Sequence, residues 1–179
     1  MIAMATLTRD PLQRLRVDAV GYGAKDTGEM GGGAASSVLA AAGSKLPIAL
    51  RSKLATTARQ IGDAVVTDSF NMRAQGVLWI AHIISIIKHT PDGAYCPHPE
   101  RLRDGVAAAL QQLSALGARS VAISALGTGE GRVRPNDAAR YMLEGVRMHR
   151  RAQPTSALAV TFSLPTFADY EAFAREVAK

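Results

Sequence analysis

The sequence has 179 residues, enough for one domain with a full hydrophobic core, and its 47% hydrophobic and 20% charged residues are typical of a globular protein. The single cysteine, Cys96, excludes an internal disulfide and a cysteine-based metal site. A net charge of +6 favours anionic partners such as phosphates or nucleic acid, but aromatic residues make up only 5% of the chain, so stacking platforms for single-stranded nucleic acid are scarce.

The N-terminal region predicts two short strands, each followed by a turn or a loop. Met1–Thr8 can form the first strand, and Asp10 lies where this strand gives way to a turn. Val17–Val20 is the second, and Tyr22–Gly33 is expected to be a loop because it carries several glycines, including the run Gly31–Gly33. A glycine run directly before a helix is where a bound group can approach the backbone closely.

The rest of the chain alternates predicted helices and strands, which indicates an α/β layered fold with a mainly parallel sheet and helices on both faces. Lys88–Glu100, which contains three prolines, is expected to be a loop. The predicted helices are Ala34–Ala42, Pro47–Ile61, Arg101–Gly117, about Pro135–Arg151 and a last one from Phe167; the predicted strands are Asp63–Thr67, part of Gly76–Ile87, a short one from Val121, and Ala157–Leu164.

Location and assembly are constrained only weakly. No signal-peptide pattern opens the sequence, and the most apolar run, Gly76–Ile87, is too short to span a bilayer and contains His82. A cytoplasmic protein without a membrane partner is therefore expected. A monomer is the expected state, although nothing in the sequence fixes it.

The strongest functional signal is a pair of glycine-rich loops. Gly127, Gly129 and Gly131 alternate between an apolar strand and a helix that opens at Pro135, and this layout can hold a phosphate on backbone amides. Either loop alone could be a plain turn. Because both loops follow strands of one parallel sheet, both can face one crevice at the carboxyl ends of those strands.

Several polar residues have both a structural and a functional interpretation. Lys25 and Asp26 are solvated loop charges, or else Lys25 contacts a hydroxyl or phosphate and Asp26 serves as a general base. Arg132 and the nearby Arg134 form a solvated basic edge, or else their guanidinium groups bind a phosphate. His82, in an apolar strand, is interpreted as a core histidine whose hydrogen bonds are satisfied.

No metal is expected. The residues that invite a metal site share one proline-rich loop, and their spacing matches no pattern of ligands. These residues are His89, Cys96, His98 and Glu100.

Four segments in order resemble the macrodomains, an α/β/α module that binds ADP-ribose. Asp10 resembles the acidic residue after the first strand that recognises adenine, although it could instead cap a turn. The other matching segments are Val17–Val20 with Gly31–Gly33 and Ala41–Gly43, which resemble the strand, first binding loop and helix; Gly62–Thr67 with Ile80–His82, which resemble the middle strands; and Ser124–Arg132, which resembles the second, diphosphate-binding loop.

The resemblance implies a single domain over residues 1–179, a three-layer α/β/α sandwich around a mixed, mainly parallel sheet of about six strands. It implies ADP-ribose as the ligand and no cofactor. The residues that it implies for binding are Asp10, Pro11, Tyr22, Gly31, Gly32, Gly33, Ala34, Ala125, Leu126, Gly127, Thr128, Gly129, Glu130, Gly131, Arg132 and Phe167.

Departures from the family pattern affect catalysis more than binding. Many hydrolytic macrodomains carry an Asn-Ala-Ala-Asn stretch whose second Asn contacts the distal ribose, and the matching residues here are Tyr22–Lys25. Their Asp after the glycine run, which helps to position a water, is Ala35, and the following His is Leu39. Pro165 stands where an aromatic residue covers the adenine, with Phe167 close enough to substitute.

Three functions follow as alternatives. The first is a module that binds ADP-ribose or ADP-ribosylated targets. The second is an enzyme that removes ADP-ribose from protein or nucleic acid, or deacetylates O-acetyl-ADP-ribose, with Lys25 and Asp26 as candidate catalytic residues. The third is an RNA- or polyanion-binding protein that uses the net charge of +6. Missing Asn and Asp residues favour the first over the second, and scattered basic residues weaken the third.

Overall fold

The computed structural model describes residues 4–57, 59–90 and 93–179. Its strands within that part are β1 (Thr6–Thr8), β2 (Ala19–Lys25), β3 (Ala64–Asp68), β4 (Trp79–Thr90), β5 (Gly93–Tyr95), β6 (Ser120–Ser124) and β7 (Ala159–Ser163). They form a sheet in the order β1-β7-β6-β2-β4-β3, and β5 pairs with β4. The neighbours from β1 to β4 run parallel, whereas β3 and β5 lie antiparallel to β4.

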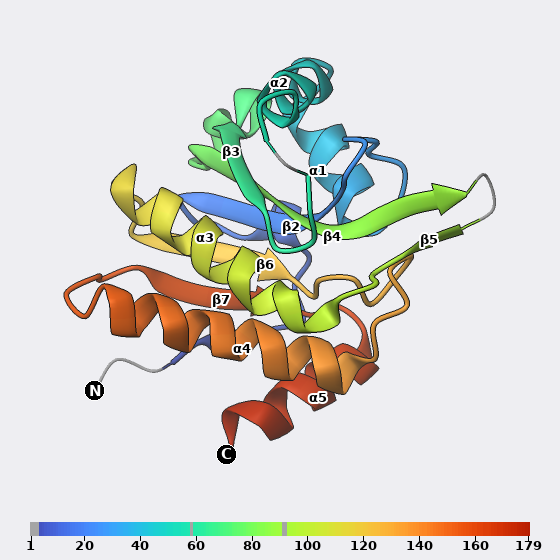
Figure 1. Cartoon of the computed structure of the whole chain (residues 1–179). Coiled ribbons are helices and arrows are strands. Elements are labelled where there is room, and N and C mark those ends of the chain that lie inside the picture. Colours follow the sequence, from blue (N-terminus) through green and yellow to red (C-terminus); the bar gives the residue numbers. More distant parts are fainter. Residues whose placement is uncertain (1–3, 58, 91–92) are drawn as a thin grey trace.

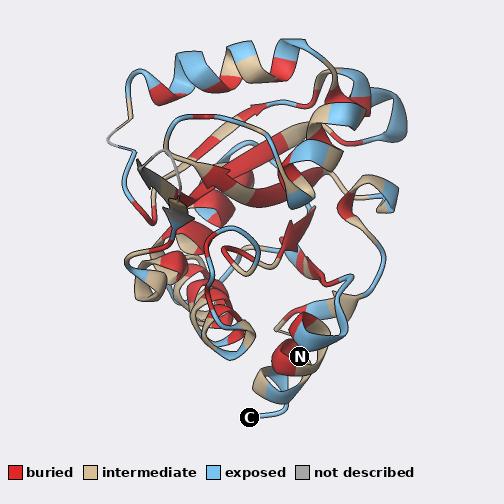
Figure 2. Ribbon diagram, turned by 90° about the vertical axis from the view of Figure 1, so that its right-hand side faces the viewer, coloured by how far each residue is buried: buried red, intermediate tan, exposed pale blue. Residues whose placement is uncertain are grey.

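The helices sandwich this sheet (Figures 1 and 2). They are α1 (Gly33–Ala42), α2 (Lys45–Leu54), α3 (Leu102–Ala115), α4 (Pro135–Ala152) and α5 (Phe167–Val177), with 3-10 turns η1 (Leu12–Arg14), η2 (Phe70–Gln75) and η3 (Pro99–Arg101). α3 packs on β3, β4 and α4, and α5 packs on α4 and β1. α1 lies against β2 and α2 against β3. The predicted α/β/α fold with a mixed, mainly parallel sheet is confirmed.

Apolar periodicity explains the helices that cover the sheet. α4 begins at Pro135, whose fixed φ suits the first helical turn, and buries Ala138, Met142 and Val146 on one stripe. Close contact with the sheet needs glycine on α3, because a Cβ at Gly105 would lie 2.6 Å from the Cγ2 of Ile83. Figure 2 shows the resulting core, with buried strands at the centre and exposed outer helix faces.

The boundaries of the first two predicted strands differ from those in the structure. The second strand extends to Lys25, so Tyr22–Lys25 is strand and the predicted loop over these residues is wrong. Gly21 and Gly23 suggest a loop, yet here they let neighbours pack closely: a Cβ at Gly21 would lie 3.2 Å from the side chain of Ile123. Of the predicted first strand, Thr6–Thr8 is confirmed, and residues 1–3 lie outside the described residues.

Two other boundaries also differ. β4 continues to Thr90 and pairs with β5, so the predicted loop Lys88–Glu100 is wrong over this hairpin, although residues 91–92 lie outside the described residues. The helix predicted over Pro47–Ile61 ends at Leu54, whose carbonyl accepts a 2.8 Å hydrogen bond from the Nε of Arg59. Arg59 itself has φ 59°, a left-handed conformation that cannot be part of a right-handed α-helix.

No single helix in the described part of the chain is long and apolar enough to cross a membrane. Only α1 and α2 taken together meet the criteria of length and composition, and they are bent by 120° at the break between them.

Candidate ligand-binding site

A cavity of about 660 Å³ lies at the carboxyl ends of the parallel strands, where ligands bind in open α/β sheets. Its floor comes from the ends of β2, β4, β6 and β7, and its walls from the two glycine loops and the start of α5. The first loop supplies Gly31–Ala35, and the second supplies Ala125 and Gly127–Glu130. The sheet thus brings together the two loops that the sequence placed at one crevice.

The second loop is shaped by its own backbone. Gly127 has φ 73° and its carbonyl accepts a 2.9 Å hydrogen bond from the amide of Val133, which folds the loop back on itself. Gly129 does not have positive φ, and no atom lies within 4 Å of where its Cβ would be. Among the three alternating glycines, only Gly127 therefore needs left-handed backbone, while Gly129 is open toward the cavity.

The C-terminal wall is fixed by the cap of α5. The Thr166 hydroxyl caps the helix by accepting from the Asp169 amide at 3.2 Å and donates to the Asp169 carboxylate at 2.7 Å. Thr128 of the second loop reaches the same carboxylate at 3.5 Å. Thr166, Asp169 and Thr128 all line the cavity, so the cap holds the second loop against α5.

An ion pair joins the two loops across the cavity. The Nζ of Lys25, at the end of β2, lies 2.8 Å from the Oε2 of Glu130 in the second loop and 4.0 Å from the Oε2 of Glu29 in the first. The Lys25 side chain is only 15% exposed, whereas that of Glu130 is 43% exposed. The other Glu130 oxygen, Oε1, lies 2.7 Å from the position of a Cβ at Gly32, the N-cap residue of α1.

Two buried serine hydroxyls near this cavity have no hydrogen-bond partner among the described residues: those of Ser85 and Ser124. Ser124 lines the cavity, and its neighbour Ser163, which also lines it, donates to the carbonyl of Asp10 at 2.7 Å. A buried hydroxyl without a partner costs free energy, so Ser124 offers a polar atom that a ligand can satisfy.

Most of the predicted binding residues line the cavity. They are Pro11, Gly31, Gly32, Gly33, Ala34, Ala125, Gly127, Thr128, Gly129 and Glu130, together with the candidate catalytic residue Lys25. Ala35 also lines it, at the position where the resembled hydrolases carry Asp.

Tyr22, predicted to contact the ligand, is fully buried in the sheet and does not line the cavity. Its hydroxyl lies 2.7 Å from the Nδ1 of His82, and burial raises the pKa of the phenol. Thr67 lies 2.8 Å from the Nε2 of the same imidazole, and burial lowers the pKa of His82 to about 3. His82 is therefore a neutral core histidine with both ring nitrogens bonded, as predicted.

Other predicted residues lie outside the cavity lining. Asp26 follows β2, and its amide donates to the carbonyl of Ile86 at 3.0 Å, so its backbone is part of the sheet end rather than of the cavity. Phe167 opens α5 and is 67% exposed, so it does not cover the cavity in this structure. Three residues of the second loop are also absent from the cavity lining: Leu126 and Gly131, which are buried, and Arg132, which is exposed.

Asp10 is at the rim. It is exposed, directly precedes the lining residues Pro11–Gln13, and exchanges two 3.1 Å hydrogen bonds with the Thr8 hydroxyl. Both of its interpretations, turn capping and base recognition, therefore remain compatible with its position.

Sequence reasoning missed several lining residues. Ser124 and Ser163 end β6 and β7, whereas Thr166 and Asp169 lie at the start of α5. Thr166 with Asp169 three residues later is a helix-capping signal that was readable in the sequence. No comparable signal marks Gly23 or Ile86, which line the cavity only because of strand pairing.

No group of three or more His, Cys, Asp or Glu side chains that could hold a metal occurs among the described residues. Burial raises the pKa of the Cys96 thiol to about 11, which makes it a weak ligand at neutral pH.

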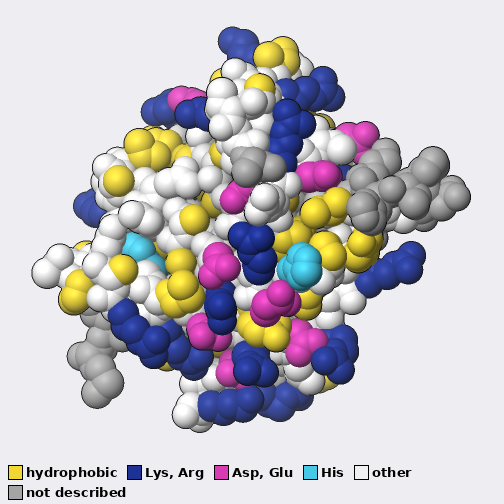
Figure 3. Space-filling view, viewed as in Figure 1, with side chains coloured by type: hydrophobic (Ala, Val, Ile, Leu, Met, Phe, Trp, Pro, Cys, Tyr) yellow, Lys and Arg dark blue, Asp and Glu magenta, His cyan; other side chains and the backbone are white. Residues whose placement is uncertain are grey.

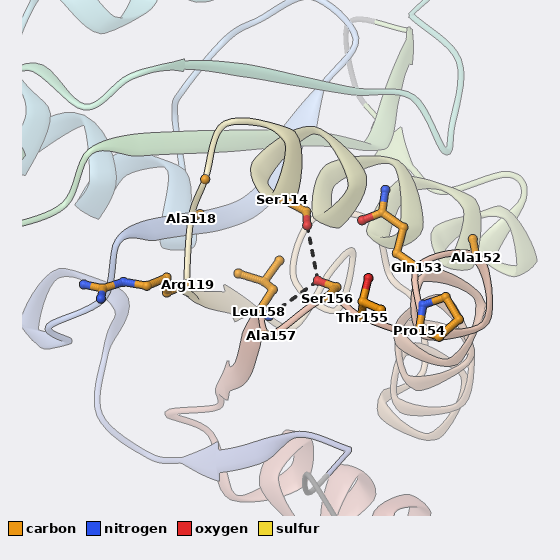
Figure 4. A pocket seen from close by; sticks show the side chains of 11 residues that line it. Ser114, Ala118, Arg119, Ala152, Gln153, Pro154, Thr155, Ser156, Ala157 and Leu158 are labelled. Carbon is orange, nitrogen blue, oxygen red and sulfur yellow. Dashed lines mark hydrogen bonds between the residues drawn. The ribbon is translucent and has the colours of Figure 1, made fainter.

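A second cavity, of about 480 Å³, lies at the opposite ends of β6 and β7 (Figure 4). Two of its serines are hydrogen-bonded: the Ser156 Oγ lies 3.2 Å from the Ser114 Oγ and 3.2 Å from the Nε2 of His149. The amide of Leu158 also donates to Ser156 at 3.4 Å.

The Macro domain family matches residues 23–142 of the chain. A Trypanosoma brucei macrodomain in complex with ADP-ribose is 22% identical, with a TM-score of 0.74 over 94% of this chain and 67% of that chain. An Oceanobacillus iheyensis macrodomain with ADP is 19% identical, with a TM-score of 0.79 over 96% of this chain and 88% of that chain. At these identities the likeness concerns the fold.

Uncharacterized proteins of Mycobacterium tuberculosis and Mycobacterium bovis are 30% identical over 164 residues, which is 92% of this chain and 42% of theirs. The chain thus spans less than half the length of these curated relatives. The family match covers both glycine loops and more than half of the chain. The chain belongs to the macrodomain family.

Proposed function

We propose that this chain binds ADP-ribose, free or attached to a macromolecule, in the cavity between the two glycine loops. The two loops are far apart in the chain, yet both line one cavity of about 660 Å³ at the carboxyl ends of the strands. This observation carries the proposal. That volume is within the range of about 300–1,000 Å³ for small-molecule sites.

The chemistry of the cavity suits a nucleotide diphosphate. The start of α1 has no side-chain cap, so the free amides of its first turn and the positive end of its dipole are available to an anion. Lys25 adds a positive charge at the same place. Open glycines such as Gly129 allow phosphate oxygens to approach the backbone.

Hydrolysis has weaker support than binding. Ala35, in the cavity wall, cannot hold or deprotonate a water, and Asp26 is not among the lining residues. Nucleic-acid binding also has weaker support, because acidic and basic side chains are interspersed over the face shown in Figure 3. Several basic side chains are paired with carboxylates, as in Arg103–Glu144 at 4.0 Å and Arg134–Asp137 at 2.7 Å.

The test is a calorimetric titration of the purified chain with ADP-ribose, with ADP and GDP as further ligands. We expect saturable binding of one ADP-ribose per chain, weaker binding of ADP, and still weaker binding of GDP. Absence of saturable ADP-ribose binding at millimolar concentration would contradict the proposed function.

A further inference from the structure

The ion pair between Lys25 and Glu130 lies inside the cavity of the proposed ligand, since both residues line it. Lys25 projects from the end of the central strand β2 and is largely covered, so its charge is directed into the cavity. Glu130 comes from the opposite loop and meets it at 2.8 Å. Glu29 is more distant, at 4.0 Å from the same nitrogen.

The Glu130 carboxylate also lies against the amino end of α1. Its Oε1 is 2.7 Å from the place that a Cβ at Gly32 would take, so the carboxylate lies directly beside the N-cap backbone. A lysine ammonium and a helix amino end together are the groups that a phosphate would select. The Glu130 carboxylate therefore occupies the position that a phosphate of a ligand would take.

Ser124 independently indicates that this cavity is built for a ligand. Ser124 lines the cavity, and its buried hydroxyl has no hydrogen-bond partner among the described residues, even with Glu130 paired to Lys25. The side chain of Glu130 leaves that hydroxyl unsatisfied, whereas a ligand that fills the cavity can supply the missing oxygen or donor.

We infer that Glu130 is an internal competitor for the anion subsite formed by Lys25 and the amino end of α1, and that an anionic ligand must displace it to bind. The inference rests on the proposed function for its natural ligand, but the subsite itself is defined by the protein's own ion pair. Displacement is feasible because Glu130 is nearly half exposed, and a partly exposed ion pair is weak enough to exchange its carboxylate for a phosphate. Glu130 then lowers affinity for every anion that uses the subsite.

The experiment is a calorimetric comparison of the parent chain with Glu130→Gln, using ADP-ribose and inorganic pyrophosphate as separate ligands. Glu130→Gln keeps the size of the side chain and removes the competing charge, so we expect binding of both ligands to tighten by about threefold to tenfold. Glu144→Gln is the matched control, because Glu144 has an ion pair at 4.0 Å to Arg103 and does not line the cavity. We expect no change in that variant.

A second variant identifies the subsite. The double variant Lys25→Met/Glu130→Gln should lose the gain in affinity that Glu130→Gln gives, because it removes the ammonium group for which the Glu130 carboxylate and the ligand compete. Unchanged or weaker binding of both ligands by Glu130→Gln would overturn the inference while leaving ADP-ribose binding intact. Tighter pyrophosphate binding without any ADP-ribose binding would uphold the inference and overturn the proposed function.

Discussion

The two cavities of this molecule lie at opposite ends of the same strands, β6 and β7, and differ in how their polar groups are satisfied. At the amino ends, Ser114, Ser156 and His149 bond to one another, and burial together with Arg150 lowers the pKa of His149. At the carboxyl ends, Ser124 has no partner among the described residues and the first turn of α1 has no side-chain cap.

Under the proposed function, this difference separates a structural cavity from the ligand-binding one. Where polar groups bond internally, a ligand gains little by entering, since it must break those bonds. Where they are left open beside a cation and a helix amino end, a ligand supplies what the fold lacks. Cavity size alone would not make this distinction, because both cavities are hundreds of cubic ångströms in volume.

The largest expected effect concerns turnover, because the carboxyl-end cavity offers binding groups without an evident base at Ala35. Loss of a positioned base typically costs about 10²–10⁴-fold in rate. We expect ADP-ribose release from a modified protein to be slower by that factor than with a macrodomain that carries Asp at the matching position. Chromatographic measurement of released ADP-ribose tests this.

Any residual release should depend on Lys25, which lines the cavity, and not on Asp26, which does not. Lys25→Ala is therefore expected to abolish it and Asp26→Ala to leave it unchanged. Rapid multiple turnover by the parent chain would contradict this prediction and reveal a base elsewhere in the cavity.

The next prediction tests directly whether the ligand binds in the carboxyl-end cavity or in the amino-end cavity. Gly129→Val places a branched side chain where Gly129 has open space and no positive φ, so the variant should fold while its side chain fills the diphosphate position. We expect affinity for ADP-ribose to fall by at least about 100-fold, or about 2.7 kcal/mol.

Ala157→Val is the matched control, since it adds the same kind of bulk to the amino-end cavity at an exposed residue. Calorimetry should detect no change in this variant. The opposite result, with Ala157→Val impaired and folded Gly129→Val normal, would move the site to the other end of the strands.

A smaller effect is expected at the rim of the binding cavity. Asp10→Ala removes the carboxylate proposed to accept from the adenine amine, which should weaken ADP-ribose binding by about 1–3 kcal/mol and reduce the preference for ADP over GDP. Asp10→Asn keeps an acceptor oxygen and should lose less. If Asp10→Ala binds ADP-ribose as well as the parent does, Asp10 has only the turn-capping role that its bonds to Thr8 already support.

A last effect concerns stability rather than binding, and it contrasts the open cavity with the closed interior. His82 is held neutral by burial with a pKa near 3, whereas an unfolded histidine titrates near 6.5. Between these values the unfolded chain binds the extra proton, so the free energy of unfolding should fall as pH falls from about 6.5 toward 3, by up to about 1.4 kcal/mol per pH unit.

Urea unfolding at a series of pH values measures this slope. His98→Asn, at an exposed histidine, should keep it, and His82→Asn should reduce it. A His82 imidazole whose NMR signals titrate above pH 5 in the folded parent would contradict the prediction directly.

The sequence predicted the layers and the glycine loops because their signals are local: apolar spacing on α3 and α4, Pro135 at a helix start, and glycine runs after strands. It failed where tertiary pairing overrides local preference. Gly23 suggests a loop, yet pairing with β4 keeps it in β2, and Gly21 is paired with both β4 and β6. Tyr22, between these glycines, is therefore buried.

The key contacts of the site were also beyond sequence reasoning. Lys25 and Glu130 lie far apart in the chain, and nothing local in either loop predicts that they meet at 2.8 Å. The unsatisfied Ser124 hydroxyl is likewise visible only once all of its neighbours are placed.

The most direct test of the central claim is a ¹H–¹⁵N NMR titration of the labelled chain with ADP-ribose. Glycine amides report on both cavities, with Gly31, Gly32 and Gly129 in the carboxyl-end cavity and Gly117 in the other. We predict saturable shifts for the first three glycines and none for Gly117. Shifts confined to Gly117 and its neighbours, or no shifts at all at millimolar ADP-ribose, would contradict the account.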